Sequence, residues 1–150
     1  MKIIQLSKGQ KTTVDDEDFG IISRHKWCFS VRGYAVSRIN KKVIYLHRFI
    51  LKVSDPKVKI DHANRNQLDN RKSNLRLCTT AQNIANSGLN KKNTSGYKGV
   101  FMVPEYVHKS KRWCAMYRHK NLGYFSTPKE AAERYNKEIK ELYGEFAYQN

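Results

Sequence analysis

The stretch Leu46–Asn86, LHRFILKVSDPKVKIDHANRNQLDNRKSNLRLCTTAQNIAN, decides the fold of the first part of this 150-residue chain. Near its middle Asp61 and His62 stand side by side, and the run 63–73 that follows is rich in Asn and Asp. Asn and Asp side chains bond their own backbone and tolerate left-handed geometry, so this run is typical of a tight polar loop. The consecutive acid and histidine therefore come directly before a predicted loop.

The residues after this loop predict a short strand and then a short helix. The run 75–78 alternates apolar and polar side chains, which is typical of a strand. Thr79 and Gln82 stand at capping-box spacing and Gly88 provides a stop, so a helix is expected over 80–86. The expected order is strand, loop, strand, helix.

Asp61 and His62 provide two different chemical functions. A carboxylate is a hard oxygen ligand suited to Mg²⁺ or Mn²⁺. A neutral imidazole can take a proton from an attacking water. Neighbouring residues of a regular strand point to opposite faces, so the two can share a site only where the strand ends or kinks, and the loop from Ala63 supplies that end. The pattern predicts one divalent-metal site that cleaves phosphodiesters.

The segment resembles the HNH (ββα-metal) endonuclease core, as found in phage and bacterial homing endonucleases. The matching positions are Asp61-His62, Asn74, and Asn83 where many relatives carry a second His. The resemblance implies that His62 is the general base, that Asp61 and Asn83 hold a single metal, and that Asn74 braces the loop. An amide oxygen at Asn83 favours Mg²⁺ or Mn²⁺ over zinc.

His47 and three arginines of this segment are further candidates. His47 lies in the apolar run 43–51, where a structural histidine is the default interpretation and a site-shaping role the alternative. Arg48, Arg71 and Arg76 carry charge that could offset a phosphate.

The composition limits the class of partner and the compartment. Lys and Arg number 29 against 13 acids, a net charge of +16 that favours polyanions but does not separate DNA from RNA. The three cysteines show no Cys-x-x-Cys spacing, so neither a structural zinc nor a disulfide framework is expected. With no apolar run of membrane length and no signal-peptide pattern, we expect a cytoplasmic protein of a bacterial host cell.

The last third of the chain predicts a small sheet packed on one helix. After a polar linker at 90–96, the runs 97–103, 111–118 and 122–125 read as three short strands. Thr127 then caps a helix whose apolar side chains recur at three- and four-residue steps up to Gly144. Residues 90–128 carry eight basic and one acidic side chain, so the sheet is expected to face nucleic acid.

This region resembles the AP2/ERF DNA-binding domain through YKGV at 97–100, RWCAMYR at 112–118, LGYF at 122–125 and the helix start at Thr127. By position, the resemblance implies DNA contacts from Lys98, Gly99 and Arg118. The other residues predicted to bind DNA are Arg112 and Lys120 of this region and Arg48 and Arg76 of the first. The sequence departs from plant relatives at Phe101, Val103 and Asn121, so their sequence preference does not transfer.

The sequence thus predicts an α+β protein with a β-rich N-terminal extension (1–46), a nuclease core (47–89), a linker (90–96) and an AP2/ERF-like domain (97–150). The predicted function is metal-dependent hydrolysis of double-stranded DNA, with Mg²⁺ or Mn²⁺ as cofactor. One active site per chain favours a nick by a monomer, whereas a dimer could make two cuts. The alternatives are a non-cleaving AP2-type DNA-binding regulator and, from charge and aromatics alone, an RNA-binding protein.

Overall fold

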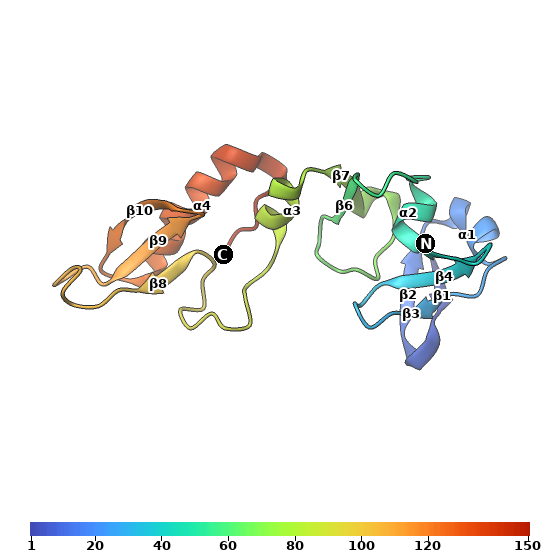
Figure 1. Ribbon diagram of the computed structural model, residues 1–150, viewed down its shortest axis with the longest axis horizontal. Coiled ribbons are helices and arrows are strands. Elements are labelled where there is room, and N and C mark those ends of the chain that lie inside the picture. Colours follow the sequence, from blue (N-terminus) through green and yellow to red (C-terminus); the bar gives the residue numbers. More distant parts are fainter. The chain divides into compact units, whose positions relative to one another are not determined.

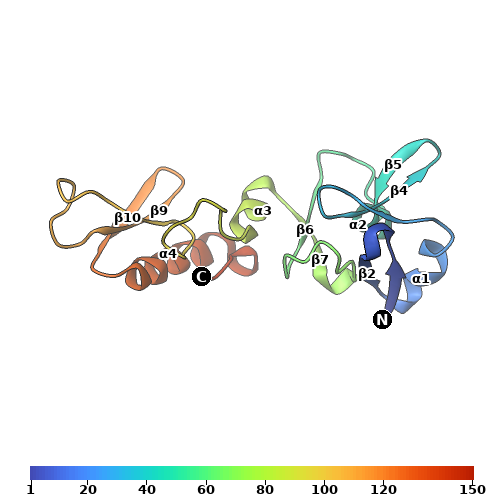
Figure 2. The same ribbon diagram turned by 90° about the horizontal axis from the view of Figure 1, so that it is seen from below.

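A computed structural model describes residues 1–150 and divides them into two units, Met1–Asn83 and Ile84–Asn150 (Figure 1). The first unit has three small antiparallel sheets and the second has one, each with a few helices, which confirms the predicted α+β class (Figure 2). The division falls inside helix α3 (Thr80–Asn86), whereas the sequence placed a linker at 90–96.

The first unit contains three small sheets, β1–β2, β3–β4–β5 and β6–β7. In chain order its elements are β1 (Lys2–Gln5), β2 (Lys11–Val14), α1 (Asp16–Ile22), β3 (Cys28–Phe29), β4 (Ala35–Ile39), β5 (Lys42–Tyr45), α2 (Leu46–Ile50), β6 (Lys59–His62) and β7 (Leu75–Cys78), with short 3-10 turns at Ser7–Gly9 and Lys72–Asn74. The apolar run 43–51 therefore splits between the end of β5 and α2.

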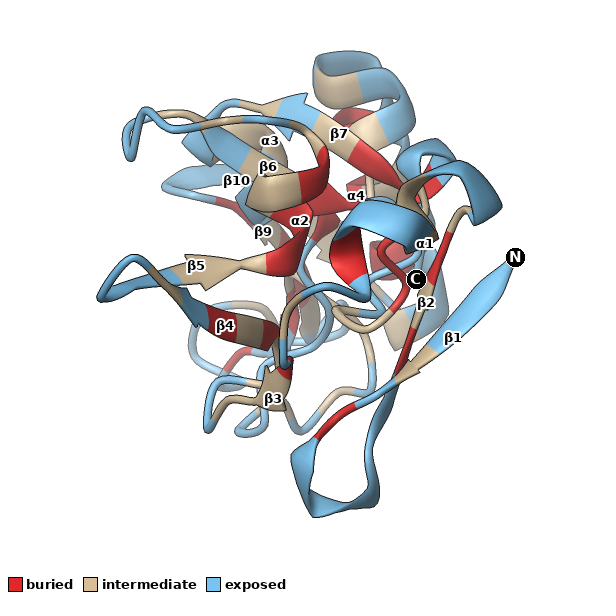
Figure 3. Cartoon of the chain, turned by 90° about the vertical axis from the view of Figure 1, so that its right-hand side faces the viewer, coloured by how far each residue is buried: buried red, intermediate tan, exposed pale blue.

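Residues 1–46 share one hydrophobic core with the segment that follows them. Buried side chains of β2 and α1 pack with those of α2 and β7. Figure 3 colours the buried segments of these elements red. The core consists of Leu6, Val14, Ile22, Trp27, Ala35, Leu46, Ile50 and Leu75. The predicted extension is thus part of the same unit as the predicted nuclease core.

The acidic run at the start of α1 holds the polar loop. The Lys72 ammonium lies 2.6 Å from the Glu17 carboxylate and 3.0 Å from that of Asp18. The backbone N–H of Lys72 also donates to Asp15 Oδ2 at 2.7 Å. Asp16, Glu17 and Asp18 lie in the first turn of α1, where the helix dipole favours negative charge, and the bonds to Lys72 give the acidic run a second role.

The second unit is a three-stranded antiparallel sheet with one long helix. The strands β8 (Val100–Met102), β9 (Trp113–Tyr117) and β10 (Lys120–Phe125) lie in sequential order, and α4 (Pro128–Tyr143) follows, with a 3-10 turn at Gly144–Phe146. The Thr127 hydroxyl accepts from the N–H of Glu130 at 3.2 Å, as the capping pattern predicts. A separate core forms from Ala85, Val100, Ala115, Tyr117, Ala131, Ala132, Tyr135 and Ile139.

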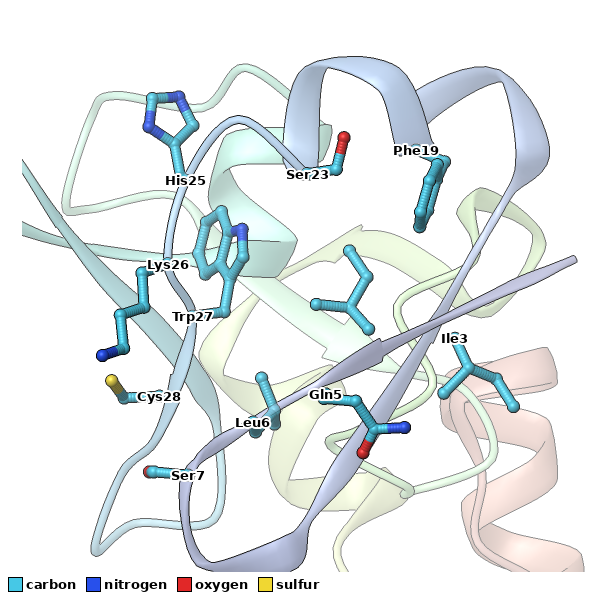
Figure 4. A pocket seen from close by; sticks show the side chains of 11 residues that line it. Ile3, Gln5, Leu6, Ser7, Phe19, Ser23, His25, Lys26, Trp27 and Cys28 are labelled. Carbon is cyan, nitrogen blue, oxygen red and sulfur yellow. The ribbon is translucent and has the colours of Figure 1, made fainter.

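An apolar hollow of about 540 Å³ lies in the first unit between β1 and residues 25–28. Figure 4 shows the Leu6, Phe19 and Trp27 side chains around it. No predicted site residue lines this hollow, so the candidate active site lies elsewhere in the unit.

Candidate active site

Asp61 and His62 are the last two residues of β6, and both side chains are buried. The chain leaves the strand at Ala63, whose N–H donates to the Asn74 carbonyl at 2.9 Å. The two neighbours therefore sit at a strand end, which is the position that a shared site requires.

Asn74 connects two points of the loop between β6 and β7. Its Oδ1 accepts from the N–H of Asn64 at 2.9 Å, and its Nδ2 donates to the Asp69 carbonyl at 2.8 Å. The side chain is buried, so these bonds replace the water that the amide would otherwise bind. This placement suits the brace that the resemblance implies, and its effect on catalysis stays a prediction.

Asp69 forms a second anchor of the loop. Arg71 donates from Nε to Asp69 Oδ1 at 2.7 Å and from Nη2 to Oδ2 at 2.6 Å, and Asn64 Nδ2 donates to Oδ2 at 2.7 Å. The hydrogen bonds from Arg71 lower the pKa of Asp69 below its ordinary value. Arg71 is thus engaged within the loop.

Asp61 is paired with Arg76 across the β6–β7 ladder, where the two residues stand directly opposite each other. Arg76 donates from Nε and Nη2 to Asp61 Oδ2 at 2.9 and 2.8 Å. Both side chains are largely withdrawn from solvent, at 7% exposure for Asp61 and 16% for Arg76. The arginine predicted to face a phosphate therefore also orients the predicted metal ligand.

His62 is buried at the end of β6. Burial lowers the pKa of its imidazole, against the opposing effects of a hydrogen bond with Asn70 and of the Asp61 and Asp69 charges. Its Nε2 lies 3.3 Å from Asn70 Oδ1. A lowered pKa keeps the ring neutral at neutral pH, which is the state that a general base needs.

His47 lies against His62, with ring centroids 5.3 Å apart in an edge-on arrangement. The rings of Tyr34 and Tyr45 lie 5.3 and 5.5 Å from that of His47, and Tyr34 is also 6.1 Å from His62. Burial, followed by the proximity of His62 and Arg48, lowers the pKa of His47 to about 3. The structure thus brings His47 to the site as a neutral ring.

This low pKa predicts that acid destabilises the fold through His47. Above about pH 6.5 the His47 ring is neutral in both the folded and the unfolded chain, and its contribution to the free energy of unfolding is fully present. Between about pH 6.5 and pH 3 only the unfolded chain binds the proton, so this contribution is lost as the pH falls. By pH 5 the loss from His47 alone is about 2 kcal/mol in the free energy of unfolding. Urea titrations at several pH values should show a shallower slope for His47→Phe than for wild type.

Tyr45→Phe is the matched control for this measurement, since it changes a ring in contact with His47 without removing a group that titrates in this range. It should keep the wild-type pH slope. An equal slope in His47→Phe and wild type would contradict the assignment.

Asn83 and Arg48 occupy different surroundings. Asn83 lies exposed on α3, one turn after Thr79 and directly after Gln82. These two residues form the capping pair, in which the Thr79 N–H donates to Gln82 Oε1 at 2.7 Å. The Arg48 guanidinium donates to the carbonyl of Val58 at 3.0 Å and to that of Asp55. Arg48 therefore holds the chain before β6, and we leave it out of the proposed DNA contacts.

Comparison with known proteins places these elements in a family. A sequence model described as HNH endonuclease matches residues 45–85, the range that contains α2, β6, β7 and most of α3. The chain is also 35% identical over 150 residues to an uncharacterized HNH endonuclease of Acanthamoeba polyphaga mimivirus, covering 95% of this chain and 76% of the relative. No solved structure matches the chain.

The chain belongs to the HNH endonuclease family. It is therefore an enzyme, a hydrolase that cleaves DNA. HNH endonucleases generally use a divalent metal ion. The buried Asp61 carboxylate fits such an ion, because its oxygen atoms are hard donors of the kind that Mg²⁺ and Mn²⁺ prefer.

In the second unit of this HNH endonuclease, two residues predicted to bind DNA serve the fold. The Lys98 ammonium donates to the carbonyls of Ile84, Ala85 and Ser87 at 2.7–2.8 Å, at the end of α3. Gly99 has φ +72°, and a Cβ there would lie 2.0 Å from the Tyr135 ring. Both positions are explained by packing, so we leave them out of the proposed DNA contacts.

The remaining predicted contacts of this unit are basic side chains on or beside the sheet. The Lys120 ammonium pairs with Glu138 at 2.6 Å, and Arg134 pairs with the same carboxylate at 3.0 Å. Arg112 and Arg118 are exposed, with the Arg118 guanidinium 5.5 Å from the Tyr117 ring. These two arginines are the better-placed cations for a phosphate.

Sequence reasoning missed two residues that bear on His62. Asn70 lies in the predicted polar loop and Thr12 in the predicted β-rich extension, and the sequence assigned neither of them a role. They lie 58 positions apart and are joined by a hydrogen bond of 2.8 Å. No spacing rule connects such positions, although the burial of Asn70 in a polar loop is the kind of anomaly that marks a site.

Proposed function

We propose that this enzyme hydrolyses a phosphodiester bond of double-stranded DNA in a metal-dependent reaction, with His62 as general base. The observation that supports this most directly is the placement of His62 at the end of β6. There it is buried, has a lowered pKa, and directly follows the oxygen ligand Asp61.

The chain's own residues would act as follows. His62 takes a proton from a water molecule while the oxygen of that water attacks the phosphorus. The bond from the phosphorus to the 3′ oxygen breaks on the opposite side. Arg76 orients the carboxylate of Asp61. Asn74 keeps the loop after His62 closed.

Asp61 and Asn83 would hold the ion, Mg²⁺ or Mn²⁺. When bound, such an ion polarises the phosphate and stabilises charge on the leaving oxygen. The preference for these ions follows from the oxygen donors, since carboxylate and amide groups suit hard cations.

The second unit would position the enzyme on duplex DNA. Its antiparallel sheet and helix agree in order with the AP2/ERF-like expectation, and Arg112 and Arg118 offer exposed positive charge. Phosphate contacts of this kind fix the register of a protein on DNA without reading its sequence.

Substituting Arg118 should weaken binding in a salt-dependent way. Each phosphate contact that is lost should reduce the slope of log Kobs against log salt by about 0.9. Arg118→Gln and Arg112→Gln should each show this change in fluorescence-anisotropy titrations of a labelled duplex at several salt concentrations.

Lys98→Met removes the same charge from a residue that caps α3. It should leave the salt slope unchanged and lower the melting temperature instead. A slope reduced by Lys98→Met and not by the arginine variants would reverse this assignment.

The activity itself is tested with supercoiled plasmid DNA. We expect the wild-type protein to cut it with Mg²⁺ or Mn²⁺ and not with EDTA. The expected product is the nicked form, because one active site per chain cuts one strand. A dimer would give linear DNA. Plasmid that is bound and never cut, across diverse DNA, would favour the non-cleaving regulator.

A homing role in a phage or bacterium and a location in the host cytoplasm are further proposals, drawn from the family resemblance and from the sequence. None of the helices in this structure combines the length and the apolar character needed to cross a bilayer.

A further inference from the structure

Asn70 and Thr12 are polar side chains that the first unit buries almost completely, with 1% and 0% exposure. A buried amide or hydroxyl without a hydrogen-bond partner destabilises the folded state. Leu and Val would fill similar space without that risk, so packing alone gives no reason for these two residues. Their hydrogen bonds supply one.

The hydrogen bonds fix which way the Asn70 amide points. The Thr12 hydroxyl donates to the Leu68 carbonyl at 2.7 Å, so its oxygen is left to accept the bond from Asn70 Nδ2 at 2.8 Å. Asn70 Nδ2 also donates to the Gln67 carbonyl at 3.3 Å, a group that only accepts. The Asn70 amide nitrogen therefore points to Thr12 and its oxygen points to His62.

The orientation of this amide determines the state of the histidine ring. Asn70 Oδ1 lies 3.3 Å from His62 Nε2, and an amide oxygen can only accept. Nε2 must then carry the hydrogen, and in a neutral imidazole the lone pair resides on Nδ1.

The N-terminal hairpin keeps this arrangement in place. The N–H of Asn70 donates to the Thr13 carbonyl at 2.8 Å, and the N–H of Thr13 donates to the Leu68 carbonyl at 2.9 Å. Strand β2 is thus bonded to the loop on both sides of Asp69 by backbone, and through Thr12 by a side chain.

We propose that Asn70, oriented by Thr12, is a positioning residue that fixes His62 in the Nε2–H tautomer, so that Nδ1 is the atom that takes the proton from the attacking water. This inference rests on the proposed role of His62 as general base. The N-terminal hairpin would thus take part in the reaction indirectly, through Asn70 and His62, without itself contacting DNA.

The test reads the tautomer directly, in the full-length protein without metal. Two-bond ¹H–¹⁵N correlation spectra of the histidine rings, with His62 assigned by its loss in His62→Ala, distinguish a protonated from an unprotonated ring nitrogen. Wild type should show a protonated-type Nε2 and an unprotonated-type Nδ1. Asn70→Leu and Thr12→Val should shift this pattern towards a mixture of tautomers.

Thr12→Val removes the hydroxyl at nearly the same side-chain volume. Thr12→Ser is the matched control, because it keeps the hydroxyl and removes only the methyl group. It should retain the wild-type pattern. If Asn70→Leu does not fold, the comparison of Thr12→Val with Thr12→Ser still decides the outcome.

Cleavage kinetics of the same variants complete the test. Loss of an orienting neighbour typically costs 10- to 100-fold, and we expect about this loss in kcat for Asn70→Leu, with KM for DNA unchanged because Asn70 is buried. Thr12→Ser should cleave as wild type does.

A protonated Nδ1 in wild type, or an unchanged tautomer in both Asn70→Leu and Thr12→Val, would overturn the positioning role while leaving the nuclease proposal intact. A different outcome is that the tautomers shift as expected but His62→Ala cleaves at the wild-type rate. That result would remove His62 as general base, and with it the catalytic part of the inference.

Discussion

His62→Ala should lower the rate of DNA cleavage by a factor on the order of 10² or more while leaving DNA binding intact. Loss of a positioned general base typically costs this much, because water must then lose its proton without a partner. The side chain is 5% exposed and lies at the end of β6, so its removal should change the site and leave the rest of the molecular surface nearly unchanged.

The measurement is the initial rate of plasmid nicking with Mn²⁺, together with the affinity for a labelled duplex. His25→Ala is a matched control, since His25 belongs to the same unit, lies against Phe49 and has no proposed role in the reaction. The control should cleave as wild type does. Wild-type rates in His62→Ala would remove this residue from the mechanism.

Asp61→Asn should lower the rate of metal-dependent cleavage about as much as His62→Ala does. It should also remove the stabilisation of the fold that the bound metal ion gives. A ligand that binds only the folded state raises the free energy of unfolding by RT ln(1 + [L]/Kd), about 2.7 kcal/mol at one hundred times Kd. In thermal melts, Mn²⁺ should raise the melting temperature of wild type and have little effect on Asp61→Asn.

This variant also removes the charge that pairs with Arg76, so it should melt at a lower temperature even without metal. Asp69→Asn separates the two effects, because it breaks another carboxylate–arginine pair, with Arg71 in the loop between β6 and β7, and no metal role is proposed for Asp69. It should lose stability and keep the response to Mn²⁺. A full response to Mn²⁺ in Asp61→Asn would exclude this carboxylate as a ligand.

Local chemistry made several elements predictable. The capping pairs Thr79 with Gln82 and Thr127 with Glu130 form as expected, because a cap needs only residues three positions apart. The strand over 75–78 and the helix over 80–86 begin and end where the sequence placed them. The loop between β6 and β7 was equally readable from its Asn and Asp content.

The unit boundary and the roles of several basic residues were not predictable in this way. Residues 1–46 join the nuclease unit because apolar side chains from both segments share a core, and composition alone does not tell which cores are shared. Lys98 matched a DNA-contacting position by resemblance, and its ammonium instead meets three carbonyls at the end of α3. A motif gives a residue's place in the chain and says little about which neighbour satisfies its charge.

The sequence by itself determined that Asp61 and His62 are adjacent, that a loop follows them and that a helix carries Asn83, since each of these features depends on neighbours in the chain. Only the tertiary structure decided that Arg76 orients Asp61 and that Asn70 orients His62. The first depends on the register of two strands, and the second on a bond between side chains 58 residues apart. Hydrogen bonds are short and directional, so the partner of a buried group is known only once distant segments are folded together.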